Sequence, residues 1–573
     1  MRCCCLALIR LQDFPLLLPD RNTELHFGNI PVVDIQRSKF KINNDHKLTM
    51  NTGDLIPIYQ SEILPGDTVK MKLSSLIRMT TPIDPVMDNA YCDFYWFFVP
   101  NRLTWDHWEE FMGENKTSYW AQPEEYQIPW VNVGEETAWR KGDVADYMGM
   151  PIGVHNIGMS ALYFRSYALI YREWFRSENL QEPPAVSTDV STDVSITNES
   201  TQLDDSIIGA ELGGKPLKVT KYADYFTTAL PSPQKGEDVY LPLGNTAPVL
   251  TGIDDNLPST GAPYAPLKWK TTSGVDYGAA GYLYDLKTNE AEGTFVRQES
   301  ATSGVDAAVA PSNLYADLSV AEAATVNQLR QAFAVQRLLE KDARGGTRYR
   351  ELIKSHFLVT TADARMQVPE YLGGKRVPIN MTQVIQNSAT DAVSPQGNTA
   401  AYSLTIDSDD HFTHSFTEHG ILMCVAAIRT DHTYQQGINR QLTRRNRLDY
   451  YFPTLANIGE QYIKNKEIYA QGTDADEEAF GYQEAWAEYR YMPSRVSGEL
   501  RSTYATPLDS WHYGDYYTEQ PVLGSEWIQE TDANVARTLA IQGQDQFIAD
   551  FYFEGIFTRP MPVYSVPGLI DHH

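Results

Sequence analysis

Apolar and polar side chains near the start of the chain follow two clear strand patterns. After a Pro-Gly-Asp turn at residues 65–67, the apolar residues Val69, Met71 and Leu73 alternate with polar neighbours, which predicts a half-buried strand. Residues 94–99 (FYWFFV) are apolar on both faces of the next strand, so both faces need cover. A helix, a second sheet or a neighbouring subunit supplies that cover.

The spacing of apolar residues becomes helical in four segments. Aromatic residues at three-residue intervals predict a short amphipathic helix over residues 105–111, and a longer apolar face predicts a helix over 160–177. A broad apolar side predicts a third helix over 321–342, which the glycines at 345–346 end. A short fourth helix is predicted over 348–357.

Strand patterns return in the last third of the chain. Residues 420–428 are continuously apolar, residues 482–491 are rich in aromatic side chains, and residues 547–554 alternate again. Strong strands near both chain ends, with long insertions between them, favour a Greek-key or jelly-roll barrel, whose first and last strands meet. A parallel α/β fold is excluded because regular strand and helix alternation is absent.

The pattern divides the chain into a strand-rich frame and several excursions. Residues 1–48 are predicted to be an N-terminal extension and arm, and residues 49–244 and 314–573 to form the frame. Residues 245–313 are rich in Gly, Pro, Ser, Thr and Asp, which predicts a small β-rich excursion on the surface. The repeat VSTDVSTDVS within residues 181–214 predicts a mobile loop.

Composition limits the class of protein. The chain has 573 residues, of which 42% are apolar, enough for a large core, and no apolar run reaches the roughly 20 residues of a membrane helix. A net charge of -27 argues against nucleic-acid binding by the whole surface. Without an export signal, and with five cysteines at residues 3–5 and at Cys92 and Cys424, we expect a reducing compartment and no disulfides.

Signs of chemistry are weak. The motifs of common hydrolases, kinases, metalloproteases and dinucleotide-binding enzymes are absent, so we expect neither catalytic residues nor a cofactor. The densest histidine and acid cluster contains Asp409, Asp410, His411, His414 and His419. On a strand, His411 and His419 share a face while His414 does not, so we interpret these residues as structural and predict no metal site.

Two groups of side chains are candidates for binding or assembly. The motif RQLTRRNR contains Arg440, Arg444, Arg445 and Arg447, whose guanidinium groups either bind a phosphate backbone beside the aromatic residues 450–452 or hold carboxylates across a subunit boundary. The second group consists of large aromatic residues that belong to a core or to an interface: Phe94, Trp96, Phe98, Phe551 and Phe553.

Several long passages together resemble one protein family. They include LIPIYQSEILPGDTVKMKL, PVMDNAYCDFYWFFVPNRLTWDHWEEFMGE, NQLRQAFAVQRLLEKDARGGTRYRELIKSHF and TYQQGINRQLTRRNRLDYYFPTLANIGEQ. Over residues 26–573, apart from 181–214 and 245–313, the chain resembles the major capsid proteins of microviruses, in their gokushovirus branch. Residues 1–25 have no counterpart in this pattern, and we interpret them as an upstream extension or the product of a misplaced start codon.

The resemblance implies a mainly β fold, an eight-stranded antiparallel jelly-roll barrel with long loop insertions and a few helices. It implies self-assembly into a T=1 icosahedral shell around a circular single-stranded DNA phage genome, with minor virion proteins of the DNA-binding and pilot type as partners. Residues 245–313 are then expected to form a protrusion near the threefold axes that contacts the host surface. The expected locations are the virion and, during assembly, the cytoplasm of a bacterial host.

Two functions from different classes are therefore compared. The first is a structural capsid subunit, whose large apolar interfaces would explain a strand that is apolar on both faces. The alternative is a β-rich secreted glycosidase or glycan-binding protein. The aromatic content and acidity of the chain favour this alternative, and the missing export signal counts against it.

Overall fold

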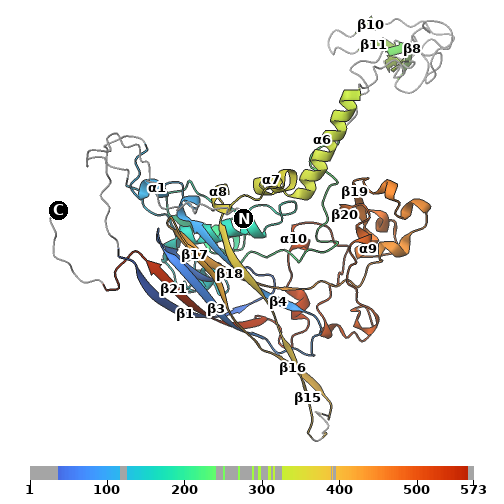
Figure 1. The fold of residues 1–573 in the computed structure, drawn as a ribbon. Coiled ribbons are helices and arrows are strands. Elements are labelled where there is room, and N and C mark those ends of the chain that lie inside the picture. The colour runs from blue at the N-terminus through green and yellow to red at the C-terminus, as the bar shows by residue number, and fades with distance from the viewer. Residues whose placement is uncertain are drawn as a thin grey trace, which may run out of the picture.

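The computed structural model of the chain describes residues 36–116, 125–239, 326–388, 390 and 395–564, together with six short strands between residues 249 and 316. Two β-sheets form the centre of the described part (Figure 1). Helices and loops cover one of these sheets, and a C-terminal lobe, which we define as residues 431–531, lies beside them.

The two central sheets each contain four antiparallel strands. The first sheet has the order β1-β21-β3-β17, and the second has the order β14-β4-β18-β2. Strand β1 pairs with β21 along its whole length, so the predicted meeting of the first and last strands is confirmed. The bounds are β1 (Ser38–Met50), β2 (Ile56–Ile63), β3 (Thr68–Met79), β4 (Ala90–Pro100), β14 (Glu370–Pro378), β17 (Thr405–Ser415), β18 (Gly420–Thr430) and β21 (Phe547–Arg559).

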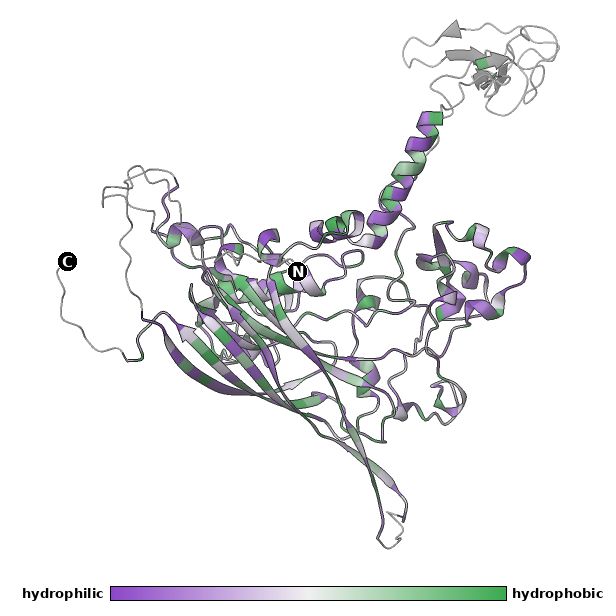
Figure 2. Cartoon of the chain, in the orientation of Figure 1, coloured by the Kyte–Doolittle hydropathy of each residue, from purple (hydrophilic) through white to green (hydrophobic). Residues whose placement is uncertain are grey.

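The strands of the first sheet have one buried face. In β3, Val69, Met71 and Leu73 are buried, while Lys70 is exposed and Lys72 is half-buried, which confirms the predicted alternation. The turn before this strand places Gly66 at φ +89°, a conformation that glycine adopts without strain. Phe551 and Phe553 are buried in the same way in β21, and Figure 2 shows apolar and polar residues alternating along these strands.

Strand β4 is buried on both faces, as its sequence predicts. On one face, Phe94 and Trp96 lie in a first hydrophobic core between the two sheets. On the other face, Phe97 and Val99 lie in a second core together with helix α3 (Ala161–Ile170). The chain itself covers both faces, so the expectation that subunit interfaces explain this strand is wrong.

Short elements between β4 and residue 219 build the second core. The helix predicted over 160–177 is α3, continued by a π-helical turn over Tyr171–Phe175, and Ser160 caps its first turn by accepting a hydrogen bond from the Leu162 amide. The helix predicted over 105–111 is shorter and begins at Trp108. The other bounds are α1 (Trp108–Phe111), β5 (Trp130–Val133), α2 (Val144–Tyr147), β6 (Gly158–Ser160), β7 (Val194–Ile196), α4 (Glu199–Gln202) and α5 (Gly209–Leu212).

The prediction of a mobile loop over residues 181–214 is wrong. This segment contains β7, α4 and α5, and Ile196, Leu203 and Leu212 are buried in the second core. The polar repeat misled the prediction because the apolar residues that anchor the segment are too widely spaced to form a periodic pattern.

The strands between residues 249 and 316 pair only with one another. They form the orders β10-β11-β12-β9 and β13-β8. The rest of the predicted excursion over 245–313 lies outside the described residues. The bounds are β8 (Val249–Thr251), β9 (Trp269–Thr271), β10 (Lys287–Thr288), β11 (Phe295–Gln298), β12 (Ala307–Pro311) and β13 (Leu314–Ala316).

Helix α6 (Val326–Gly345) follows the excursion and stands out from the two sheets (Figure 1). It ends at the predicted glycines. Its apolar side is not packed, because Val326, Phe333 and Leu338 are 64%, 58% and 51% exposed. Its base is fixed to the C-terminal lobe by Arg344, whose Nε donates a hydrogen bond of 3.0 Å to Glu460. Helices α7 (Tyr349–Phe357) and α8 (Asp363–Met366) then lead to β14.

A third hydrophobic core joins the C-terminal lobe to residues 225–229, and it includes Phe226, Tyr434 and Trp527. The strand predicted over 482–491 ends at Glu484, because the chain turns at Trp486, which has φ +66°. Outside the lobe, β15 and β16 form a projecting hairpin (Figure 1). The remaining bounds are β15 (Met381–Ile385), β16 (Thr399–Ser403), β19 (Glu460–Lys464), α9 (Asn465–Ile468), β20 (Ala479–Glu484), α10 (Ser525–Ile528) and α11 (Ala533–Ala536).

Residues 38–48 were predicted to belong to an arm, but they form most of strand β1. The alternation is weak there because β1 is an edge strand whose middle residues are exposed. Cys92 and Cys424 lie in strands β4 and β18 as predicted, and burial raises the pKa of both thiols. Among the described residues, no helix has both the length and the apolar character of a membrane span.

Candidate functional site

The five aromatic candidates all lie in the first core between the two central sheets: Phe94, Trp96, Phe98, Phe551 and Phe553. Rings from the two sheets meet there, with centroids 5.5 Å apart for Phe94 and Phe551 and 6.0 Å apart for Trp96 and Phe553. Each of the five side chains is at most 2% exposed. Within one chain, these residues therefore hold the sheets together.

Two of the four candidate arginines are paired inside the C-terminal lobe. Arg440 donates a hydrogen bond of 3.2 Å to Glu467 and another of 2.9 Å to the Tyr462 carbonyl. Arg444 donates to Glu488 over 2.7 Å, and both side chains of this pair are less than one-tenth exposed. These carboxylates belong to the same chain, so the charges of the two arginines are compensated within their own lobe.

The other two arginines are exposed. Arg445 and Arg447 carry no carboxylate within ion-pair distance in the described part of the chain. The guanidinium of Arg447 lies 5.5 Å from the centroid of the Phe452 ring, and the backbone amide of Arg445 donates to Asp449. In the described part of the chain, Arg440 and Arg444 are thus paired with carboxylates, whereas Arg445 and Arg447 are not.

The histidine and acid cluster on β17 does not converge. A β-bulge between Asp410 and Phe412 breaks the simple alternation, so His411 lies beside Trp96 and accepts a hydrogen bond of 3.1 Å from its indole nitrogen. His414 instead lies 3.9 Å from Glu370. Within the described ranges, no group of three or more metal-ligating side chains comes together.

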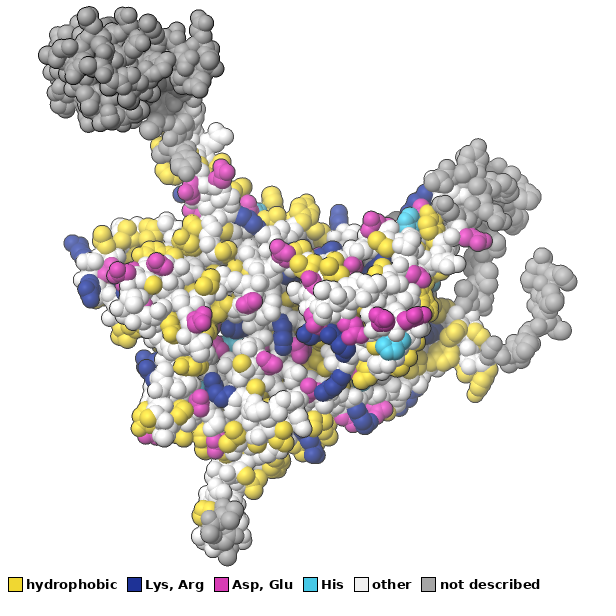
Figure 3. All heavy atoms as spheres, turned by 180° about the vertical axis from the view of Figure 1, so that it is seen from behind, with side chains coloured by type: hydrophobic (Ala, Val, Ile, Leu, Met, Phe, Trp, Pro, Cys, Tyr) yellow, Lys and Arg dark blue, Asp and Glu magenta, His cyan; other side chains and the backbone are white. Residues whose placement is uncertain are grey.

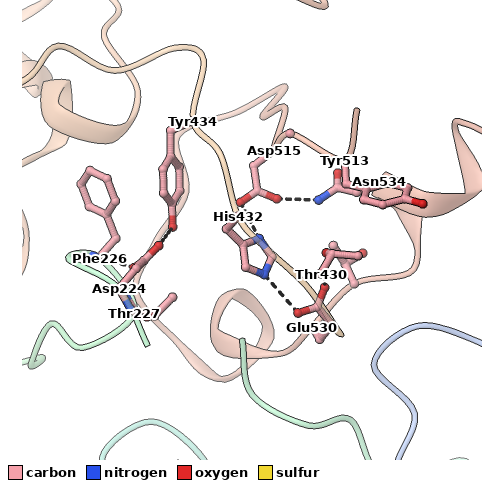
Figure 4. Close-up of polar contacts among 12 residues, drawn as sticks. Asp224, Phe226, Thr227, Thr430, His432, Tyr434, Tyr513, Asp515, Glu530 and Asn534 are labelled. Carbon is pink, nitrogen blue, oxygen red and sulfur yellow. Dashed lines mark hydrogen bonds and ion pairs between the residues drawn. The ribbon is translucent and has the colours of Figure 1, made fainter. Parts of the chain in front are cut away.

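Sequence reasoning missed a buried polar network at the junction of β18 and the C-terminal lobe (Figure 4). His432 lies between two carboxylates, with Nδ1 3.0 Å from Asp515 and Nε2 3.0 Å from Glu530. Asn534 donates to the other oxygen of Asp515 over 2.6 Å, and Thr430 donates to Glu530 over 3.0 Å. No local motif signals this network, because its members lie up to about a hundred positions apart in the chain.

The side chains of this buried network are ionised. Burial alone would lower the pKa of His432, but the carboxylates of Asp515 and Glu530 outweigh that effect and raise the pKa to about 10. Burial opposes ionisation of Asp515 as well, yet the charge of the imidazolium keeps the pKa of this carboxyl below its usual range. All three side chains are at most 4% exposed, so no substrate reaches them, and their role is structural.

Charges on the surface are mixed. Lys and Arg side chains are interspersed with Asp and Glu on the face shown in Figure 3, and apolar side chains lie among them. Apolar side chains that are more than half exposed include Met87, Leu442 and Ile406. A subunit that buries part of its surface against copies of itself fits this mixed surface better than an enzyme with a single cleft.

Two β-sheets around an aromatic core, with long insertions between their strands, define a mainly β protein. The comparison with known families places this protein among viral shell components. The model of the family described as capsid protein (F protein) matches residues 28–569. The chain belongs to this family.

Three relatives span nearly the same length, and each is named capsid protein VP1. The relative from Spiroplasma virus 4 is 41% identical over 547 residues, which cover 93% of this chain and 96% of the relative. The relative from Bdellovibrio phage phiMH2K is 40% identical over 559 residues, or 96% and 99% of the two chains. The relative from Chlamydia phage 1 is 39% identical over 585 residues, or 95% and 97%.

These comparisons confirm the resemblance to microvirus capsid proteins and the structural role. The chain is a capsid protein of the virion and not an enzyme. The alternative of a secreted glycosidase or glycan-binding protein is therefore wrong. Its main support, the aromatic content, is explained by the three cores, in which many of the Trp, Tyr and Phe side chains are buried.

Proposed function

We propose that this chain is the main building block of a T=1 icosahedral shell around a circular single-stranded DNA genome. The observation that carries the proposal is the family match over residues 28–569, together with three capsid relatives of the same length. Minor virion proteins of the DNA-binding and pilot type are further partners. Assembly then takes place in the cytoplasm of the bacterial host.

The frame of each subunit in this proposal is an eight-stranded jelly-roll barrel. Support comes from the strand orders β1-β21-β3-β17 and β14-β4-β18-β2, which interleave strands from both ends of the chain in two facing sheets. The shared first core supports the same arrangement, since residues of both sheets contribute to it. The long connections after β4, β14 and β18 are the loop insertions.

The excursion between residues 245 and 313 forms a surface protrusion near the threefold axes and contacts the host surface. Its support is the position of α6, which stands out from the sheets and exposes Val326, Phe333 and Leu338. An amphipathic helix with an unpacked apolar side is expected to pack against copies of itself around a symmetry axis.

Arg445 and Arg447 are the side chains in the arginine run that face the genome, since Arg440 and Arg444 are paired within the chain. The double substitution Arg445→Ala with Arg447→Ala is expected to lower the DNA content of purified particles. Arg490→Ala is the matched control, because Arg490 lies in the same lobe but pairs with Glu484. Unchanged DNA content with weakened shells would assign the two arginines to a subunit boundary instead.

Sedimentation of the purified full chain tests the assembly itself. We expect one fast-sedimenting species of closed particles in equilibrium with free subunits. A chain that stays monomeric under every assembly condition tried would contradict the proposal.

A further inference from the structure

A cavity of about 290 Å³ lies in the C-terminal lobe next to the arginine run. Its walls include residues 225–226, 437–440 and 492–497, together with Tyr434, Arg501, Glu467 and Glu488. This volume is at the lower end of the ~300–1,000 Å³ of typical small-molecule sites. The cavity therefore has room for one compact planar group and not for a folded segment of a protein.

The interior of the cavity is aromatic, and its buried charges compensate each other. The rings of Phe226 and Tyr434 pack edge to face, with their centroids 4.7 Å apart. Glu467 accepts hydrogen bonds from Tyr225 over 3.0 Å and from Arg440 over 3.2 Å. A neutral planar group is thus accommodated without the cost of an unpaired charge.

The exposed part of the cavity lining carries free positive charge. Arg495 and Arg501 both line the cavity and are exposed, and neither has a carboxylate within ion-pair distance in the described part of the chain. Arg445 and Arg447 continue this set of unpaired arginines along the neighbouring run. In a chain of net charge -27, such a concentration of cations needs an anionic partner.

Exposed aromatic side chains accompany the arginines. The guanidinium of Arg444 lies 4.4 Å from the ring centroid of Tyr489 and 5.3 Å from that of Tyr450, and both rings are about half exposed. Bases of single strands stack on such rings with little dependence on sequence, and guanidinium groups bind phosphates in bidentate fashion.

We propose that this cavity captures one base of a single-stranded nucleic acid, while Arg495 and Arg501 bind adjacent phosphates. A phosphate chain alone would leave the aromatic interior unused, and an apolar side chain alone would leave the arginines unpaired. A nucleotide satisfies both requirements. The inference rests on the proposed function, in which the shell encloses single-stranded DNA.

Binding of a fluorescein-labelled deoxythymidine oligonucleotide to the purified full chain tests the inference, with an abasic oligonucleotide of the same length as the comparison. Ser497→Trp fills the cavity without removing a charge, and Ser494→Trp is a second filling variant should the first not fold. We expect the filled cavity to weaken binding of the thymidine strand about tenfold and to leave the abasic strand unaffected. Ser388→Trp, at an exposed position of the β15–β16 hairpin, is the matched control and is expected to change neither affinity.

The arginines are tested separately from the cavity. Arg495→Ala with Arg501→Ala is expected to weaken binding of both oligonucleotides. The slope of log affinity against log salt should become shallower by about 1.4, since each lost phosphate contact on a single strand accounts for about 0.7. An unchanged salt slope would remove these two arginines from the site.

The outcomes distinguish the inference from the function on which it rests. Equal affinities of the unsubstituted chain for thymidine and abasic strands would overturn the base-binding cavity while genome binding by arginines stands. If shells form but neither oligonucleotide binds, the base-binding inference is wrong and the proposed shell-forming function still stands. Weakened assembly in Ser497→Trp with unchanged oligonucleotide affinity would assign the cavity to a neighbouring subunit.

Discussion

His432 is held as an imidazolium between Asp515 and Glu530, far from solvent. Burying three ionised groups is expensive unless their charges and hydrogen bonds compensate one another. Here the charge of Lys221 adds to that of His432 in lowering the pKa of Asp515. The network therefore depends on every member, and the loss of the central cation leaves two carboxylates facing each other.

Substitution of the central histidine tests this dependence. We expect His432→Gln to lower the free energy of unfolding by ~3–5 kcal/mol, because it leaves buried carboxylates without their cation. Thermal unfolding at neutral pH measures the effect. His414→Gln is the matched control, since His414 is 42% exposed and weakly paired, and it is expected to have little effect. Equal stability of the two variants would contradict the role given to the network.

The same network sets a dependence on pH. Because the pKa of His432 is raised to about 10 in the folded chain, its stabilisation is complete below the ordinary histidine pKa of about 6.5 and is lost as the pH rises through about 10. Asp515 makes the protein sensitive to acid instead. Because the pKa of this carboxyl is lowered in the folded chain, its contribution to stability is lost as the pH falls below the usual range of carboxyls. The midpoint temperature of thermal unfolding should therefore decrease in the unsubstituted chain as the pH rises toward about 10. In His432→Gln, the same rise in pH should lower the midpoint much less.

The arginine run shows what the sequence alone can and cannot determine about single residues. Its unusual charge is visible in the motif, but the carboxylates that neutralise Arg440 and Arg444 lie 27 and 44 positions further along the chain. Tertiary packing brings these partners together, so no local pattern separates the paired arginines from Arg445 and Arg447. The His432 network was missed for the same reason.

Among the secondary elements, β4 has the most informative sequence. Its apolar run predicts burial on both faces, and the structure supplies two different cores, one against the facing sheet and one against α3. The alternation in β3 and β21 is predicted equally well, because one packed face imposes a period of two residues. Residues 181–214 contain widely spaced buried apolar residues and therefore show no such period. Their prediction as a mobile loop was wrong for this reason.

Paired substitutions in β4 test whether both of its faces belong to the core of the chain. Phe94→Ala and Phe97→Ala are each expected to lower the free energy of unfolding by ~3–5 kcal/mol, as measured by denaturant titration of the purified subunit. Ile548→Ala, at a residue that is 54% exposed in β21, is the control. If Phe97→Ala leaves the subunit stable and weakens only the shells, its face is an interface and not core.

The excursion before α6 is expected to be dispensable for folding. The described strands between residues 249 and 316 pair only with one another, so deletion of residues 250–310 is expected to break no strand pairing of the frame. A chain lacking residues 250–310 should unfold at nearly the same temperature as the full chain and should form particles that attach poorly to host cells. Collapse of the fold would contradict the division into frame and excursion.

The whole molecule combines a rigid frame with parts that lack a partner within the chain. The two sheets and three cores are complete in one subunit, whereas α6 and the exposed arginines present apolar or charged groups that find no partner among the described residues. Copies of the chain and an enclosed nucleic acid are the partners that the proposed function provides. The sequence predicted most strands of the two central sheets from their residue patterns, but not the contacts between the lobe and these sheets.

A three-dimensional reconstruction of particles formed by the purified chain tests the central claim most directly. We predict a closed T=1 shell in which the two central sheets form the continuous wall and α6 with the excursion projects outward near the threefold axes. Density for nucleic acid is expected against Arg445 and Arg447 on the inner face. Open aggregates without symmetry, or a closed shell whose wall is built from α6 and the excursion, would contradict the account.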